Sequence, residues 1–212
     1  MWQDKPFALH PVNFFALAWD CPVLPKPGTI PTGKAYTLPT TDVLCNEKNF
    51  AKVAIGWHTE GLSFFIEVNS PYKKAVFPQV EQGDSVELFI DTRDLKAAGF
   101  NTRFCHHFYF LPEPVEGHEA GEMTRFRTED RHPYCDAQLL TSQVEKKARG
   151  YTMHVFIPAA CLHGYDPKQF ERLGFTYRIN RFGNDSQHWS VVSQEYQIDQ
   201  QPALWGSIRL LP

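Results

Sequence analysis

The chain has 212 residues, of which 42% are hydrophobic and 21% are charged, and its formal net charge is −3. This is enough apolar material for one packed core, whereas the nearly balanced charge excludes the strongly basic field that non-specific nucleic-acid binding requires. No apolar run approaches the length that crosses a bilayer, so we predict no membrane association.

The 16 prolines and 13 glycines are spread along the whole length, which is typical of a β protein with many turns. We predict one domain over residues 1–212, with N-terminal strands and a proline-rich loop (residues 1–45) packed on the remainder. The N-terminus lacks the basic start and apolar run of a secretory signal, and the five cysteines include no C-x-x-C pair. We therefore expect free thiols and a cytoplasmic protein, with export by a dedicated secretion system left open.

The first clear elements form a hairpin. Residues 1–20 alternate only loosely and predict one or two opening strands, and the prolines of residues 22–33 exclude a helix there. Apolar residues then alternate over residues 53–57, a turn follows at residues 58–61, and alternation resumes over residues 62–68. This period of two predicts a β-hairpin.

The clearest strand comprises residues 85–91, Ser-Val-Glu-Leu-Phe-Ile-Asp. Val86, Leu88 and Ile90 share the face that is predicted to line the core, and Glu87 lies on the opposite face. A carboxylate in mid-strand must reach solvent or find a partner, because an unpaired buried charge is costly.

Later segments continue the β pattern, with strands predicted at residues 103–111, 123–127, 138–144, 151–157, 175–180, 189–192 and 205–211. Pro112 and Pro114 are expected to end the first of these, and residues 113–122 to form a mobile acidic loop. One helical turn is predicted at residues 159–162, and a short helix from Asp166 to Leu173. About ten strands with so little helix predict an all-β fold, a single antiparallel β-sandwich of jelly-roll-like form.

Four segments occur in a specific order: Gly83-Asp84 with the strand after it, Gly150-Tyr151 before a strand that ends in Ile157-Pro158, Leu173-Gly174-Phe175, and Pro202-Ala203-Leu204-Trp205-Gly206. This order resembles family 9 carbohydrate-binding modules and the wider DOMON-like group of β-sandwiches. The chain is also similar to bacterial relatives of that group that share an Ile-Asp-Thr-Arg-Asp segment and an Arg-Phe-Cys-His-like strand. The resemblance covers residues 50–212 and implies the sandwich fold.

In the sugar-binding members, the resemblance implies that two tryptophans sandwich the reducing-end sugar while polar side chains of neighbouring strands bond its hydroxyl groups. Glu87 occupies the position of the family carboxylate. Arg178 occupies the position of a polar contact, and Asn180 follows two residues later. These three residues are therefore candidates for ligand binding.

The family tryptophans do not carry over to this chain. Phe77 or Tyr72 on one side of the site and Tyr196 on the other are the aromatic residues that would substitute for them. Tyr109 and Arg125 complete the candidate ligand-binding set. An arginine cluster without acidic partners on this face would indicate an anionic ligand.

Two groups of residues could in principle bind a metal ion. In the strand that contains Cys105-His106-His107, His106 points away from both neighbours, which leaves too few ligands for zinc and predicts a core thiol beside surface histidines. Related modules often hold structural calcium, for which Asp91, Asp94 and Asp130 are the candidate ligands. Their spacing matches no EF-hand, so solvated turns are expected and no cofactor is predicted.

The sequence favours a non-catalytic module that binds a carbohydrate or sugar-like ligand on the concave sheet. Glu87 and Asp91 would lie about 13 Å apart along one strand, too far for a pair of glycosidase carboxylates. The alternative function is a protein–protein interaction module that kept the sandwich and lost the sugar site. A third is an enzyme whose arginine and histidine residues act on an anionic substrate.

Overall fold

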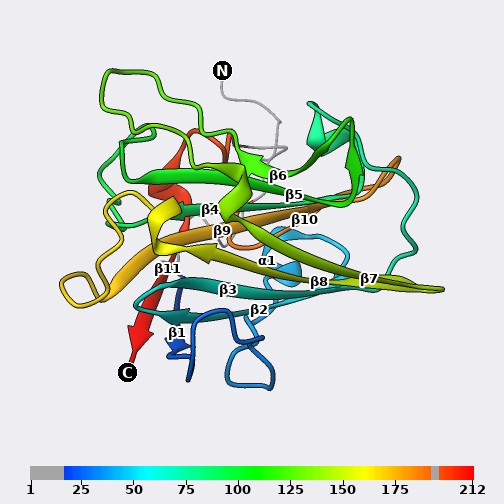
Figure 1. Ribbon diagram of the computed structural model, residues 1–212, viewed down its shortest axis with the longest axis horizontal. Helices are drawn as coiled ribbons and strands as arrows, with labels where there is room; N and C mark the ends of the chain where they lie inside the picture. The colour runs from blue at the N-terminus through cyan, green and yellow to red at the C-terminus, as the bar shows by residue number, and fades with distance from the viewer. Residues whose placement is uncertain (1–16, 192–195) are drawn as a thin grey trace, which may run out of the picture.

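Two β-sheets pack face to face and form two layers, one above the other in Figure 1. The structure is a computed structural model that describes residues 17–191 and 196–212. The seven-stranded sheet has the spatial order β1 (Ala18–Pro22), β11 (Gly206–Leu211), β9 (Arg172–Asn180), β4 (Ser85–Asp91), β5 (Cys105–Val115) and β6 (His118–Glu122), with β10 (Gln187–His188) also paired to β9. The four-stranded sheet has the order β2 (Ala51–His58), β3 (Gly61–Val68), β8 (Gly150–Pro158) and β7 (Thr141–Lys147).

Helical structure is confined to short pieces among the described residues. They are α1 (Asp42–Cys45) and the 3₁₀ turns Val80–Gln82, Ala137–Leu139, Ala159–Cys161 and Pro202–Leu204. No helix in residues 17–191 or 196–212 has the length and apolarity to cross a bilayer. The predicted all-β sandwich is confirmed, and the strand pairs are antiparallel except for β1 with β11, which is parallel.

The core lies between the two sheets. Val86, Leu88 and Ile90 of β4 are fully buried in it, as their alternation predicts. Phe64 of β3 stacks on Phe175 of β9 with ring centroids 5.7 Å apart, so the aromatic contact joins the two layers. Each such side chain contributes about 1.5–3 kcal/mol through burial of apolar surface.

The N-terminal segment contacts both sheets. While β1 pairs with β11, the backbone N–H of Leu24 donates to the Trp57 carbonyl at 2.7 Å, and that of Leu38 donates to the Val53 carbonyl at 2.9 Å. Residues 18–38 therefore run from the edge of one sheet to the edge of the other. The strands predicted before residue 17 lie outside the described residues.

Pro112 and Pro114 do not end the strand that contains them. β5 continues to Val115 and forms a hairpin with β6, so residues 113–122 are not the predicted mobile loop. The register between β5 and β6 shifts between Phe110 and Val115, so both prolines fall where the ladder is interrupted and their missing N–H groups cost no paired hydrogen bond.

The predicted helix at Asp166 is a single turn. The Asp166 carboxylate accepts the backbone N–H groups of Lys168 and Gln169, so the residue caps a turn as expected. The chain cannot continue as a helix because β9 already begins at Arg172, which pairs with Arg209 of β11. Sheet pairing overrides the local helix signal here.

Three smaller differences separate prediction and structure. Residues 123–127 do not form a strand, and the strand predicted at 138–144 lies instead at Thr141–Lys147. A strand was predicted at 189–192, but residues 189–191 are not a strand, and the two-residue β10 lies just before them. The predicted hairpin and the turn at Ala159–Cys161 are confirmed.

The prediction that all five cysteines are free thiols is wrong. Cys135 and Cys161 form a disulfide, with Cα atoms 4.8 Å apart, because the turn at Ala159–Cys161 places Cys161 beside the segment that follows β6. Cys21, Cys45 and Cys105 are buried.

Thiol titration tests this pairing. Protein that is denatured without reductant is expected to react with a thiol reagent at three positions, since two of the five cysteines are paired, and at all five after reduction. Five reactive groups before reduction, in protein purified without reductant, would contradict the disulfide.

Candidate ligand-binding site

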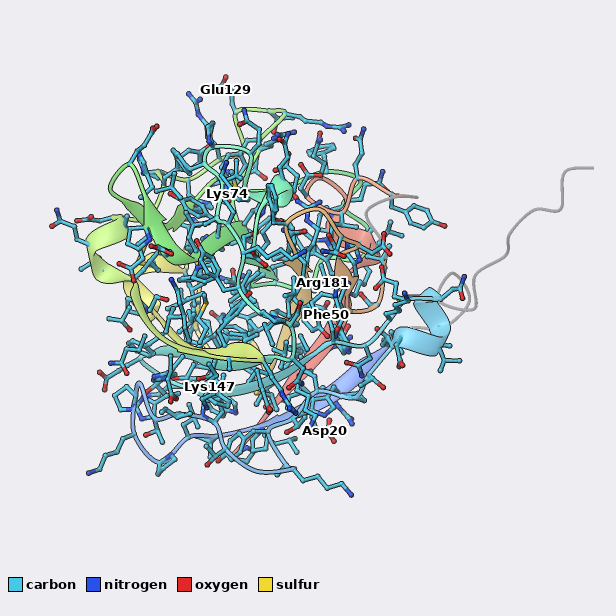
Figure 2. The ribbon with its side chains drawn as sticks, turned by 90° about the vertical axis from the view of Figure 1, so that its right-hand side faces the viewer. Asp20, Phe50, Lys74, Glu129, Lys147 and Arg181 are labelled. Carbon is cyan, nitrogen blue, oxygen red and sulfur yellow. A yellow bond between two sulfur atoms is a disulfide. The ribbon has the colours of Figure 1, made fainter. Side chains whose placement is uncertain are left out.

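The face of the seven-stranded sheet that points away from the core carries a row of residues in register. Gly121 of β6, Tyr109 of β5, Glu87 of β4, Arg178 of β9 and His188 of β10 lie opposite one another across the five strands. Directly paired residues share a face, so this row forms a band across the outer face. Loops cross above this sheet in Figure 1, and Figure 2 shows Lys74 and Glu129, from two of them, toward the opposite end of the molecule from Asp20.

The carboxylate of Glu87 is the centre of this band. Arg178 donates to it through Nε at 2.6 Å and Nη2 at 2.7 Å, in a bidentate arrangement. His107 Nε2 donates at 2.8 Å and Asn180 Nδ2 at 2.6 Å. Four donors thus engage the two oxygens of a side chain with no solvent exposure.

These contacts keep Glu87 ionised. Burial alone would raise its pKa, but the hydrogen bond from His107 and the charge of Arg178 more than offset burial and hold the pKa well below its usual range. Burial likewise acts to lower the pKa of Arg178, and the negative charge of Glu87 overcomes it and raises that pKa. The two groups form a buried ion pair.

The predicted approach of Glu87 and Arg178 across adjacent strands is confirmed. Glu87 has no lone pair left for a ligand, so it orients its neighbours. Arg178 retains 15% exposure of its side chain and uses only two of its five N–H groups on Glu87. The guanidinium therefore keeps N–H groups that the pair with Glu87 does not use.

Asn180 is also engaged by the protein. Its Nδ2 donates to the Ser85 hydroxyl at 2.9 Å as well as to Glu87, and its Oδ1 accepts the Ser186 hydroxyl at 2.6 Å. Asn180 therefore fixes the position of the carboxylate rather than offering a contact of its own.

One aromatic group lies on the β5–β6 side of the band. The ring of Phe77 lies 5.6 Å from that of Tyr109 and stacks on His118 at 3.9 Å. A Cβ atom on Gly121 would meet the Tyr109 ring at 2.9 Å, so glycine at that position lets the ring lie over β6. The candidates Phe77 and Tyr109 are thus together, beside Glu87.

A second aromatic group lies toward the C-terminal loop. Phe89 stacks on His107 at 4.2 Å and contacts Trp205 at 5.9 Å. Tyr196 packs against this cluster, as does Ile198. Tyr196 therefore lies on the same face as Glu87.

Arg125 lies at the margin of the site. Its side chain is 70% exposed and its Nη1 is 3.5 Å from Asp199 Oδ2. Asp199 also raises the pKa of Arg178 by its charge, which places the carboxylate near both arginines. Asn101 bonds the backbone carbonyls of Arg125 and Asp199 and holds the two loops together.

His107 and Asp199 were missed as members of the site. Alternation along β5 places His107 on the same face as Tyr109, so the strand pattern contained the signal for His107. The expectation that His106 and His107 are surface histidines is wrong, since both are buried. The opposite orientations of the two rings agree with the prediction.

The three aspartates considered for calcium are held apart by protein partners. Asp91 accepts the N–H groups of Arg93 and Leu95, Asp94 pairs with Lys96, and Asp130 pairs with Arg103. In the described part of the chain the three carboxylates do not form one cluster.

The sequence model of one family, described as carbohydrate family 9 binding domain-like, matches residues 32–211. The chain belongs to this family. The match confirms the predicted resemblance and extends it toward the N-terminus by including residues 32–49. No curated protein matches the chain.

Solved structures of family 9 modules share the fold. A family 9 carbohydrate-binding module from Caldicellulosiruptor kristjanssonii in complex with cellotriose superposes with a TM-score of 0.62 at 16% identity, over 91% of this chain and 93% of that one. A second family 9 module from the same organism, in complex with glucose, gives a TM-score of 0.56 at 20% identity over 76% of each chain.

Proposed function

We propose that this protein is a non-catalytic module that binds a saccharide on the outer face of the seven-stranded sheet. The observation that carries the proposal is the guanidinium of Arg178, which the buried carboxylate of Glu87 fixes in place and which still has N–H groups to donate. Membership of the carbohydrate family 9 binding domain-like family supports the class of ligand.

A sugar would use two kinds of contact. Its hydroxyl groups accept hydrogen bonds from Arg178, whose orientation is set before binding and therefore costs little side-chain entropy. The C–H face of a pyranose packs on aromatic rings, which Phe77 with Tyr109 on one side and Tyr196 on the other supply. The cellotriose and glucose complexes of the two Caldicellulosiruptor modules support a glucose-based ligand of one to three units.

The state of the carboxylates argues against catalysis at this site. A general acid or base must exchange a proton near neutral pH and reach the substrate. Glu87 is buried, carries four hydrogen bonds and has a depressed pKa, and the Asp91 carboxylate is occupied by backbone N–H groups. Neither side chain is suited to that role.

The tryptophans give weight to the alternative of a protein-interaction module. Trp57, Trp189 and Trp205 are buried, and the indole N–H of each donates to a backbone carbonyl. They support loops and strands and offer no flat surface for a sugar, so Tyr196 and Phe77 would have to do so.

Calorimetric titration with cellotriose and glucose separates the two functions. We expect the wild-type protein to bind cellotriose with a Kd of about 1 mM or tighter, and Arg178→Lys, which keeps the charge but loses the planar fork, to bind at least about tenfold more weakly. Arg209→Lys serves as the matched control, since Arg209 is exposed on β11 and pairs with Asp20. An absence of heat with either sugar at concentrations well above 1 mM, together with capture of a protein partner, would leave the interaction module.

A further inference from the structure

Three buried ionisable side chains converge on the core-facing side of the seven-stranded sheet, away from the ligand-binding band. They are His106 of β5, Glu122 of β6, and His132 in the loop after β6. Glu122 pairs with Phe108, whose side chain lies in the core, and the His106 ring stacks on Phe108 at 5.6 Å. The cluster therefore closes the core at the β5–β6 edge.

We propose that His106, Glu122 and His132 form a binding site for a divalent transition-metal ion of the zinc type. The ligand atoms of the three side chains all lie within 4.8 Å of one another. Glu122 Oε1 lies 3.0 Å from His106 Nδ1 and 2.8 Å from His132 Nε2. All three side chains have at most 2% exposure.

The hydrogen bonds of His132 point to a cation at this position. Its Nδ1 lies 2.7 Å from the backbone carbonyl of Arg103, which can only accept, so Nδ1 carries a proton. The neutral ring then has a lone pair on Nε2 that faces a carboxylate oxygen. Two acceptors 2.8 Å apart require a proton or a metal ion between them.

The surroundings resemble the outer shell of a metal site. A metal-ligating histidine usually donates its second N–H to a carbonyl or carboxylate, as His132 does to Arg103. Thr124 donates to Glu122 Oε1 at 2.7 Å, and the backbone N–H of Cys135 donates to Oε2 at 2.8 Å, so the carboxylate is also oriented. These contacts orient His132 and Glu122 before an ion binds, whereas the Nε2 atom of His106 has no hydrogen-bond partner.

The donor set selects the class of ion. Two imidazole nitrogens and one carboxylate oxygen suit zinc and its neighbours, whereas calcium and magnesium prefer oxygen ligands alone. Ligands of a tetrahedral zinc ion, with bonds of about 2.0–2.1 Å, lie about 3.3 Å apart. Glu122 Oε1 lies 3.0 and 2.8 Å from the two histidine nitrogens, so each of these two distances would increase by only a few tenths of an ångström to admit the ion.

A surface pocket lies next to the site. His132 lines a surface pocket of about 730 Å³ together with Phe126, Glu129, Arg131 and Tyr134. Figure 2 shows Glu129 projecting from the upper end of the molecule, so this pocket opens at the surface. Water in the pocket can complete the coordination of an ion that the three side chains hold.

Metal binding to protein stripped with a chelator tests the site. We expect one Zn²⁺ per chain, affinity at least roughly 100-fold lower in His132→Gln and Glu122→Gln, and unchanged affinity in His58→Gln. His58 lies in the β2–β3 turn and contacts none of the three ligands in the described structure, so it controls for adventitious histidine binding. Zinc at 100 times the Kd should raise the Tm by about 5–10 °C.

Two measurements on the wild-type protein decide the question if a variant fails to fold. Substitution with Co²⁺ should give visible d–d absorption bands, and X-ray absorption at the zinc edge should show scattering from two imidazole rings. Failure of the wild-type protein to bind Zn²⁺, retention of binding in His132→Gln, or scattering without two imidazoles would overturn the proposal. A buried proton-linked network would then remain.

Discussion

Replacement of Arg178 by alanine is expected to lower the free energy of unfolding by about 3–5 kcal/mol, because it leaves Glu87 as a buried charge without its cation. Glu87 has no exposure, and Arg178 supplies two of the four hydrogen bonds to its carboxylate. Urea denaturation at pH 7 measures the change.

The design separates the ion pair from simple loss of side-chain volume. The double variant Glu87→Gln with Arg178→Met removes both charges. Its loss of unfolding free energy should be smaller, by about 2 kcal/mol or more, than the sum of the losses in the single variants Glu87→Gln and Arg178→Met, as expected for a coupled pair. Arg209→Ala, which breaks an exposed pair with Asp20, should cost no more than about 1 kcal/mol. Equal costs for Arg178→Ala and Arg209→Ala would show that the Glu87 pair does not hold the sheet.

The central strand could be predicted from sequence because its signal is local. Alternation alone assigns Val86, Leu88 and Ile90 to the core and Glu87 to the other face, since successive side chains of a strand point in opposite directions. The partner Arg178 is 91 residues away, and only the order of segments shared with family 9 modules placed it beside Glu87.

Burial of the outer face could not be predicted in the same way. Alternation gives the face of His107 but not what covers that face. The covering comes from irregular segments around Phe77 and Tyr196, which pack on Tyr109 and Phe89 and have no periodic pattern. The sequence therefore predicts His107 as a surface residue, whereas its side chain is buried and donates a hydrogen bond to Glu87.

One incorrect prediction concealed the histidine cluster. If Pro112 and Pro114 end a strand, residues 113–122 form a loop. This prediction places Glu122 in the mobile loop and not in a strand beside His106. The hairpin instead returns Glu122 to a position beside Phe108 and within hydrogen-bonding distance of His106. The prolines mark an irregular stretch of the ladder, which residue type alone does not distinguish from a strand end.

The disulfide illustrates a similar limit. An odd number of cysteines without a C-x-x-C pair suggested thiols throughout, but spacing carries no information on distance between Cys135 and Cys161, which are 26 residues apart in sequence. The turn at Ala159–Cys161 was predicted correctly. Its position relative to the segment after β6, which contains Cys135, depends on the packing of the two sheets.

The second large effect is expected at acid pH. Glu87 has a pKa well below its usual range in the folded protein and the ordinary value of 4.5 when unfolded. Above pH 4.5 the carboxylate is ionised in both states, so the stability that it contributes is fully present. As the pH falls from there toward the folded pKa, only the unfolded state takes up the proton, and this stability is lost at about 1.4 kcal/mol per pH unit.

A comparison with Glu87→Gln separates the Glu87 network from the rest of the protein, because ionisable groups that do not contact Glu87 are the same in both proteins and their effects cancel. The wild-type protein should be the more stable of the two at pH 7, since glutamine cannot pair with the Arg178 charge. Its amide hydrogens would also face two donors, one on Arg178 and one on either His107 or Asn180, where the carboxylate has an accepting oxygen. The difference in free energy of unfolding, measured with urea at intervals between pH 7 and pH 3, should stay constant down to about pH 5 and then shrink as the unfolded wild-type chain binds the proton. Parallel curves over the whole range would mean that Glu87 has an ordinary pKa in the folded state, and the charged pair on which the ligand site rests would not exist.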